Sequence, residues 1–366
     1  MKNNVKKIKN TRYLYNAETP AGMVSVSQLQ TYAACPKKWS YNYIENLTPR
    51  VERPFLTIGK LCHKGMQIAM QHMWTNQQLE TPVPLEDVWR DAMVIGVDAM
   101  GKEYDEYLES VPYLQEELPE FEQTYKDAFS VFHQAFREFE PWKYEVLTVY
   151  KDGQPVPALE LHFHIPCTGS KGMHGYIDAI LRDRETGHVW CTDYKFRKSL
   201  SPDDEEITNI QNAVYTRACA KMGIKITGTM TWQHSNTPAA EPTLNKNGTV
   251  SRAKIRTTWD KYFGFCVEHN IDPEPYREEM QEKLADIEWF RATYEVRNEK
   301  FVDNVWEQVV VPLAKAVRSE YKKPNHSRYM YPWSCKMCQY LSLCQAELRD
   351  HDADFLRESE YVKRDR

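Results

Sequence analysis

The chain has 366 residues, a formal net charge of −5 at pH 7, and 42% hydrophobic and 27% charged side chains. These values are ordinary for a globular protein in water, and no apolar run approaches the ~20 residues that a transmembrane helix needs. The basic N-terminus lacks the apolar stretch of ~7–15 residues of a signal peptide, so we expect a cytosolic protein without membrane contacts. The negative net charge argues against a protein that coats DNA, but not against an enzyme with a basic channel.

The N-terminal part of the chain predicts helices. Five cations and no acid occupy Lys2–Arg12, which we interpret as part of a basic tail that ends at residue 24. Ser25 or Ser27 is a favoured N-cap for the helix that follows, and Pro36 should interrupt that helix. Apolar spacing farther along indicates two more helices with an acidic, polar connection between them. The helices are 58–74 and 121–139, and the connection is 103–120.

The middle of the chain predicts strands. Four strand-like runs are separated by turn signals that contain glycine; they span 143–150, 158–165, 172–182 and 187–196. A helix over 204–223, closed by Gly223, and a last strand over 224–233 follow. Several strands, a helix and one more strand predict a compact α/β core.

The C-terminal part begins with a basic loop, Leu244–Arg256, which holds four cations and no acid. These cations are Lys246, Arg252, Lys254 and Arg256. Long helical patterns run from about 257 to 319, and an aromatic, cysteine-rich segment ends the chain. We therefore divide the sequence into a tail (1–24), a helical region (25–140), an α/β core (141–237) and a C-terminal helical region (238–366).

Two aspartates and a lysine lie at the polar ends of two predicted strands. Strand alternation puts Asp193 and Lys195 on one face, and a turn at Gly187 could bring Asp178 to the same sheet edge. Two carboxylates beside a lysine suit Mg²⁺, which takes oxygen ligands and can activate a bound water. A plain ion pair is the alternative. Glu145 and Glu160, on preceding strands, are expected to be sheet-surface carboxylates; membership of the site is the alternative.

The order of these residues resembles the PD-(D/E)XK nuclease superfamily in its RecB-like branch. The matching features are His63 in a G-x-x-x-H helix, Gly-Tyr-Ile-Asp ending at Asp178, Asp-Tyr-Lys ending at Lys195, and Gln211 with Tyr215 on the next helix. Ile177 stands where the superfamily has its proline. The resemblance implies a restriction-endonuclease-like core, a mixed central β-sheet flanked by helices, with N- and C-terminal helical regions joined by a metal cluster.

The resemblance also implies roles for single residues. The ligands of a catalytic Mg²⁺ or Mn²⁺ would be His63, Asp178, Asp193 and the backbone carbonyl of Tyr194. Lys195 would serve the attacking water as a catalytic residue. Gln211 and Tyr215 would position the substrate.

Four of the nine cysteines have a spacing typical of metal ligands. Cys335, Cys338 and Cys344 form C-x₂-C-x₅-C, and Cys35 lies near the other end of the chain. Four thiolates accept either zinc or an iron–sulfur cubane. This pattern resembles the iron–sulfur members of the branch, AddB-type and CRISPR-associated nucleases, which implies a structural [4Fe–4S] cluster; zinc is the alternative.

The resemblance thus implies a metal-dependent DNA exonuclease of recombination, repair or phage DNA metabolism, acting 5′ to 3′ on single strands in a bacterial or phage-infected host cytoplasm. A helicase or single-strand annealing protein would be a partner. The basic loop resembles a segment of phage exonucleases, which implies phosphate contacts there; a solvated loop is the alternative. A CRISPR spacer-precursor-trimming or restriction-type endonuclease and a non-catalytic iron–sulfur DNA-binding subunit are the competing functions.

Overall fold

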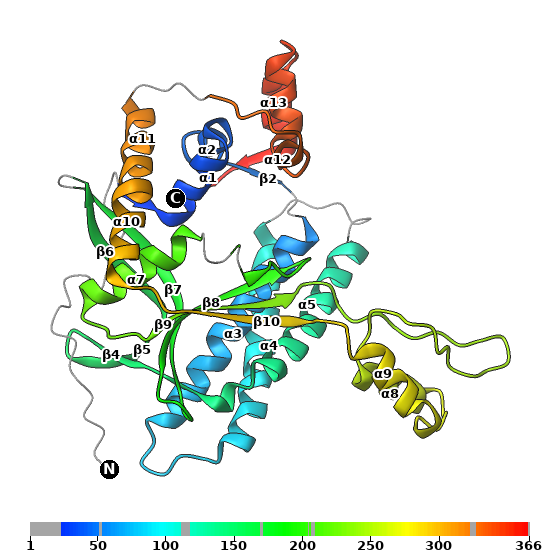
Figure 1. Ribbon diagram of the computed structural model, residues 1–366. Helices are drawn as coiled ribbons and strands as arrows, with labels where there is room; N and C mark the ends of the chain where they lie inside the picture. Colours follow the sequence, from blue (N-terminus) through cyan, green and yellow to red (C-terminus); the bar gives the residue numbers. More distant parts are fainter. Residues whose placement is uncertain are drawn as a thin grey trace.

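A seven-stranded mixed sheet forms the centre of the protein (Figure 1). The computed structural model describes residues 23–50, 53–110, 118–168, 171–203, 205, 209–322 and 327–364. The cations of the predicted tail, within 1–22, lie outside these described residues. The sheet contains β1 (Val24–Ser25), β3 (Tyr144–Val146), β6 (Leu159–Thr168), β7 (Lys171–Asp183), β8 (Val189–Arg197), β9 (Gly228–Ser235) and β10 (Phe290–Glu295). The predicted α/β class is confirmed.

Strand order follows from hairpins and one parallel crossover. The path is β1-β7-β8-β9-β10, with β3 and β6 also paired to β7. β7 and β8 are antiparallel and joined by the turn that contains Gly187, as predicted. β8 and β9 are parallel, and every residue of β9 is buried, as expected for a central strand covered on both faces.

Three helices cover one face of the sheet: α3 (Pro54–Gln77), α4 (Leu85–Ser110) and α5 (Leu118–Phe139) (Figure 1). They enclose a core with the aromatic residues of β8 and β9. The prediction of a polar connection over 103–120 is wrong for its first part, because α4 continues to Ser110. Met100 and Tyr104, four residues apart, are buried in this core, so one apolar stripe holds the acidic helix in place.

The other face is covered by α1 (Val26–Ala34), α7 (Ile210–Met222), α10 (Glu299–Val305), a π-helical turn (Trp306–Val310) and α11 (Val311–Lys322). Ser25 caps α1, its hydroxyl accepting from the Gln28 amide at 3.1 Å. The helix is interrupted before Pro36, as expected, and α2 (Pro36–Tyr43) begins at this proline. Gly223 ends α7 in a left-handed conformation with φ 77°, which glycine adopts without a Cβ clash.

The two ends of the described chain meet beside the sheet. β2 (Leu47–Pro49) pairs antiparallel with β11 (Tyr361–Lys363), and the Tyr340 hydroxyl donates to the Leu47 carbonyl at 2.7 Å. The C-terminal helices here are α12 (Pro332–Lys336), α13 (Leu341–Leu348) and α14 (Ala353–Glu360). Strand pairing and this hydrogen bond therefore dock the C-terminal segment on the N-terminal one.

The segment predicted as helical over 257–319 is interrupted. It contains α8 (Trp259–Glu268), α9 (Arg277–Leu284) and then β10, which pairs with the edge of β9. A strand forms there because β9 offers an unpaired edge, and such tertiary pairing overrides local helix propensity. β4 (Thr148–Lys151) and β5 (Gln154–Pro157) make a separate hairpin. Among the described residues, no helix has the length and apolarity to cross a bilayer.

Candidate active site

The two predicted aspartates lie where β7 and β8 separate. Their last ladder pair is Ala179 with Thr192, so Asp178 and Asp193 occupy the next position of each strand. Beyond it β8 continues beside β9 alone. Asp193 is 3% exposed, and its negative charge acts on Asp178. The antiparallel hairpin thus brings the carboxylates together as the sequence predicts.

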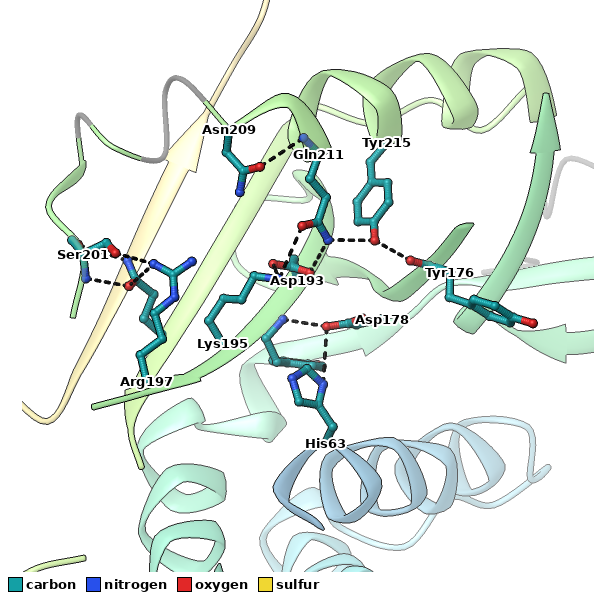
Figure 2. A network of polar contacts seen from close by, with 12 residues as sticks. His63, Tyr176, Asp178, Asp193, Lys195, Arg197, Ser201, Asn209, Gln211 and Tyr215 are labelled. Atoms are coloured by element: carbon teal, nitrogen blue, oxygen red, sulfur yellow. Dashed lines mark hydrogen bonds and ion pairs between the residues drawn. The ribbon is translucent and has the colours of Figure 1, made fainter. Parts of the chain in front are cut away.

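Lys195 neutralises the more buried of the two carboxylates. Its Nζ lies 2.6 Å from Oδ2 of Asp193 and 3.4 Å from Oε1 of Gln211 (Figure 2). Burial alone would lower the pKa of Lys195, but the charges of Asp193 and Asp178 outweigh it and raise the pKa. The side chain is therefore an ammonium at neutral pH, a hydrogen-bond donor and a fixed positive charge.

Helix α7 fixes the geometry of Asp193. Gln211 Nε2 donates to Oδ1 of Asp193 at 2.8 Å and to the Tyr215 hydroxyl at 2.8 Å. The Tyr215 hydroxyl in turn donates to the backbone carbonyl of Tyr176 at 2.5 Å (Figure 2). Burial and the two aspartates raise the pKa of Tyr215, so it stays a protonated donor. The Q-x-x-x-Y spacing puts both side chains on one helix face, toward the carboxylates.

We call the point beyond the Ala179–Thr192 pair, where β7 and β8 separate, the fork. Helix α3 supplies the histidine from the opposite side of this fork. His63 Nδ1 lies 3.7 Å from Oδ2 of Asp178, and the same oxygen accepts the Tyr194 amide at 2.8 Å. Burial and the charge of Asp193 raise the pKa of Asp178 more than His63, Lys195 and this amide lower it. The Tyr194 ring points away into the core, against Phe139 and Trp232.

A third carboxylate, Glu160, lies at the same place. It sits between the pairs Leu159–Ala179 and Leu161–Ile177, and therefore opposite Asp178. Burial and the charges of Asp178 and Asp193 raise its pKa to about 7. Glu160 thus follows the alternative of a carboxylate near the site, whereas Glu145 is a sheet-surface carboxylate that pairs with Arg182 across strands at 3.1 Å.

A groove of about 780 Å³ lies next to this site. His63 and Glu160 line the groove. Four cationic side chains that the sequence analysis did not identify also line it: Lys60, Lys64, Arg197 and Lys198. A dense carboxylate centre with a cationic rim is suited to a polyanion whose phosphate meets a bound metal ion.

The donor chemistry at the fork fits a hard divalent cation. Oδ2 of Asp193 is buried and pairs with the Lys195 ammonium at 2.6 Å. Carboxylate oxygens are the ligands that Mg²⁺ prefers. Among the described residues, however, no three His, Cys, Asp or Glu side chains converge closely enough to enclose an ion. Instead, the Lys195 ammonium pairs with Asp193, and His63 Nδ1 lies 3.7 Å from Oδ2 of Asp178.

The four predicted cluster cysteines lie near the junction of the chain ends. Cys35 separates α1 from α2, and Cys344 is in α13. Burial, Cys35 and Cys344 raise the pKa of the Cys338 thiol, so these three sulfurs are close enough to interact electrostatically. Cys335 lies one turn earlier, its carbonyl accepting from the Cys338 amide at 3.0 Å. All four are partly exposed free thiols, a donor chemistry that suits zinc or iron. Among the described residues, however, no three of these side chains stand close enough together to hold an ion, so the structure does not show a closed metal site here.

The predicted basic loop lies apart from the catalytic residues. With α8 and α9 it projects from the end of β9 (Figure 1). Arg252 pairs with Glu279, Lys254 pairs with Asp286, and Arg256 stacks over Trp289. Lys246 is exposed in the turn between Leu244 and Val250. The loop charges are therefore largely balanced by neighbours on α9 and the residues after it.

Comparison with known proteins gives one family. A family model described as the PD-(D/E)XK nuclease superfamily matches residues 23–345. The match includes the fork, the groove and all four cluster cysteines. No curated protein matches the sequence.

Proposed function

The chain belongs to the PD-(D/E)XK nuclease superfamily, and we propose that it is a Mg²⁺- or Mn²⁺-dependent DNA exonuclease. The observation that supports this most is the geometry of the fork. Asp178, Asp193 and Lys195 lie together there, and Gln211 hydrogen-bonds with both Asp193 and Lys195. A structural ion pair would not need a third carboxylate, a helical histidine and a cationic groove at the same point.

Each residue at the fork has a distinct task in phosphodiester hydrolysis. Asp178 and Asp193 would hold the metal, with His63 and the Tyr194 carbonyl as further ligands. The bound metal supplies an activated water and offsets phosphoryl charge. Lys195, held as an ammonium, orients that water and stabilises the charge that develops in the transition state. Gln211 keeps the Asp193 carboxylate oriented toward the metal.

The groove and a second hollow outline a path for DNA. Lys198 lines both the catalytic groove and a hollow of about 610 Å³ that Lys254 and Arg256 also line. A strand that leaves the fork past Lys198 would thus reach the basic loop, where phosphate contacts position it without reading its sequence. Lys246 and Arg252 would extend this contact.

We place the chain in the RecB-like branch because of the G-x-x-x-H and Q-x-x-x-Y helices. The exonuclease activity, its 5′ to 3′ polarity, and a recombination helicase or annealing protein as partner rest on that resemblance.

The four cysteines would hold a structural [4Fe–4S] cluster. Their supporting feature is position: Cys35 and the C-terminal set join chain segments about 300 residues apart, and closing so long a loop restricts the unfolded chain. Met337, between two of the cysteines, lines the catalytic groove. Loss of the cluster would therefore disturb one wall of the groove.

The test compares the parent chain with Lys195→Ala on end-labelled single- and double-stranded DNA, with Mg²⁺ or Mn²⁺. The expected result is loss of labelled ends by the parent and a rate at least ~10²-fold lower for the variant. Lys225→Ala, an exposed lysine just after α7, is the matched control and should cleave like the parent. The position of the label gives polarity.

Other outcomes identify the competing functions. Cleavage of circular single strands would show an endonuclease, and a parent that binds DNA without cleaving it would show a non-catalytic subunit. Iron content of anaerobically purified Cys338→Ser, against Cys167→Ser as control, tests the cluster. About four irons per chain in the parent and control, with loss in Cys338→Ser, is expected; one zinc per chain would contradict it.

A further inference from the structure

One exposed aromatic ring lies beside the catalytic carboxylates. Tyr176 precedes Asp178 by two residues on β7, so both side chains leave the same face about 7 Å apart along the strand. Its side chain is 49% exposed, whereas Tyr194 and Tyr215 of the same site are 2% and 5% exposed. The ring therefore contributes little to the core, and packing does not account for a large aromatic residue here.

A second aromatic ring supports Tyr176 from behind. The His162 imidazole, its partner across β6 and β7, stacks on it with centroids 4.3 Å apart and planes 9° apart. His174 then packs edge-on against His162 at 5.7 Å. Burial and the neighbouring histidines lower the pKa of His174 to about 4, so its imidazole is neutral at neutral pH. The His162 ring covers one face of the Tyr176 ring, so the exposed surface of Tyr176 is the rest of its side chain.

The main chain of Tyr176 is fixed to the catalytic carboxylates. Its carbonyl accepts the Tyr215 hydroxyl, which accepts from Gln211, which donates to Asp193 (Figure 2). Its backbone is thus tied to the carboxylate site by hydrogen bonds, and its ring is held by the His162 stack. A ring held in this way is a preorganised contact, because little freedom is lost when a ligand binds it.

Nucleobases are the flat partners that a phosphodiester brings to such a ring. We propose that Tyr176, backed by His162, is the stacking platform for the base of the nucleotide next to the phosphate held at Asp178 and Asp193. Stacking of this kind is worth about 1–3 kcal/mol per base and tolerates any sequence. Bases within a duplex are already paired and stacked, so the platform selects an unpaired strand or end. This inference rests on the proposed nuclease function and adds its substrate class.

The experiment measures binding in a chain that does not cleave. Fluorescence anisotropy with labelled single-stranded oligonucleotides is recorded for Lys195→Ala in Mg²⁺, alone and combined with Tyr176→Ala, Tyr176→Phe or His162→Ala. Tyr176→Ala should weaken binding about 5- to 150-fold, and Tyr176→Phe, which keeps the ring, should stay within about twofold. Tyr331→Ala, an exposed tyrosine of the C-terminal segment, is the matched control without effect.

An abasic series locates the stacked base. A single abasic nucleotide at one position should weaken binding to the Tyr176 protein and leave Tyr176→Ala unchanged, which is a coupling between ring and base. Equal losses for both proteins at every position, or unchanged binding by a folded Tyr176→Ala, would overturn the platform. His162→Ala should give a smaller loss at the same position, so the inference can be tested even if Tyr176→Ala unfolds.

Cleavage by the chain with Lys195 intact separates this inference from the proposed function. An increased KM for single strands in Tyr176→Ala, with kcat less affected, supports the platform. An active Tyr176→Ala with unchanged KM refutes the platform and leaves the nuclease. A parent that does not cleave while the ring–base coupling persists refutes the nuclease and leaves the platform. Absence of all oligonucleotide binding refutes both.

Discussion

Substitution of Glu160 tests whether three carboxylates really converge at the fork. The pKa of Glu160 is about 7 in the folded chain against an ordinary value of 4.5. Between these values the folded protein keeps a proton that the unfolded chain has lost, so the free energy of unfolding falls as pH rises through this window. The full difference corresponds to about 3 kcal/mol, and water in the groove reduces it to about 1–3 kcal/mol.

Glu160→Gln removes this penalty because the amide carries no charge. In the absence of divalent cations, urea unfolding should show the variant more stable than the parent by about 1–3 kcal/mol near pH 8, and almost equal to it near pH 5. Added Mg²⁺ should narrow the difference near pH 8, because a cation at Asp178 and Asp193 offsets the repulsion.

Glu145→Gln is the matched control on the same sheet. Glu145 pairs with Arg182 at 3.1 Å, so its loss should cost less than about 1 kcal/mol at either pH. A Glu160→Gln protein with the same stability difference near pH 5 and near pH 8 would refute the reasoning, since it would mean that Glu160 does not feel the two aspartates.

Three further substitutions probe the site and the sheet. Gln211→Ala should lower the cleavage rate about 10–100-fold with a small change in unfolding midpoint, because Asp193 loses its orienting donor; unchanged kinetics would contradict this. Arg297→Ala should lower the free energy of unfolding in urea by about 3–5 kcal/mol, because Glu295 would remain as a buried charge without its partner. The side chains of Glu295 and Arg297 are only 9% and 6% exposed. A loss under 1 kcal/mol would show that water reaches the pair. Gly228→Ala should destabilise by about 1–3 kcal/mol, because the new Cβ would lie 2.1 Å from the Glu295 carbonyl oxygen; a stable variant would show that β10 can shift.

Local sequence patterns determined much of the fork. The turn at Gly187 and the two-residue period of strands bring Asp178, Asp193 and Lys195 to one edge, and the helical period aligns Gln211 with Tyr215. These relations involve residues near each other in sequence, so they follow from strand and helix geometry alone. The caps at Ser25 and Gly223 are of the same kind.

Long-range contacts decided the rest. The strand β10 exists because β9 leaves an edge to pair with. The residues 103–110 are helical because α4 packs on α3 and α5, and the charges of the basic loop are balanced by residues 27–32 positions later, as in Arg252 with Glu279 and Lys254 with Asp286. No local pattern specifies such partners.

Glu160 shows most clearly what local sequence patterns could not predict. Near the turn Thr168 pairs with Lys171, but after an irregularity Pro166 pairs with Gly172. Farther along, Glu160 lies between the pairs Leu159–Ala179 and Leu161–Ile177 without a ladder pair of its own, and its backbone is left-handed with φ 43°. Strand alternation therefore does not give the direction of its side chain. Burial and the charges of Asp178 and Asp193 raise the pKa of Glu160, so its carboxylate lies near these two aspartates. The sequence alone thus determined which residues could do the chemistry near the hairpin turn. The tertiary structure decided that a third carboxylate lies near them, because no local pattern specifies the left-handed backbone at Glu160.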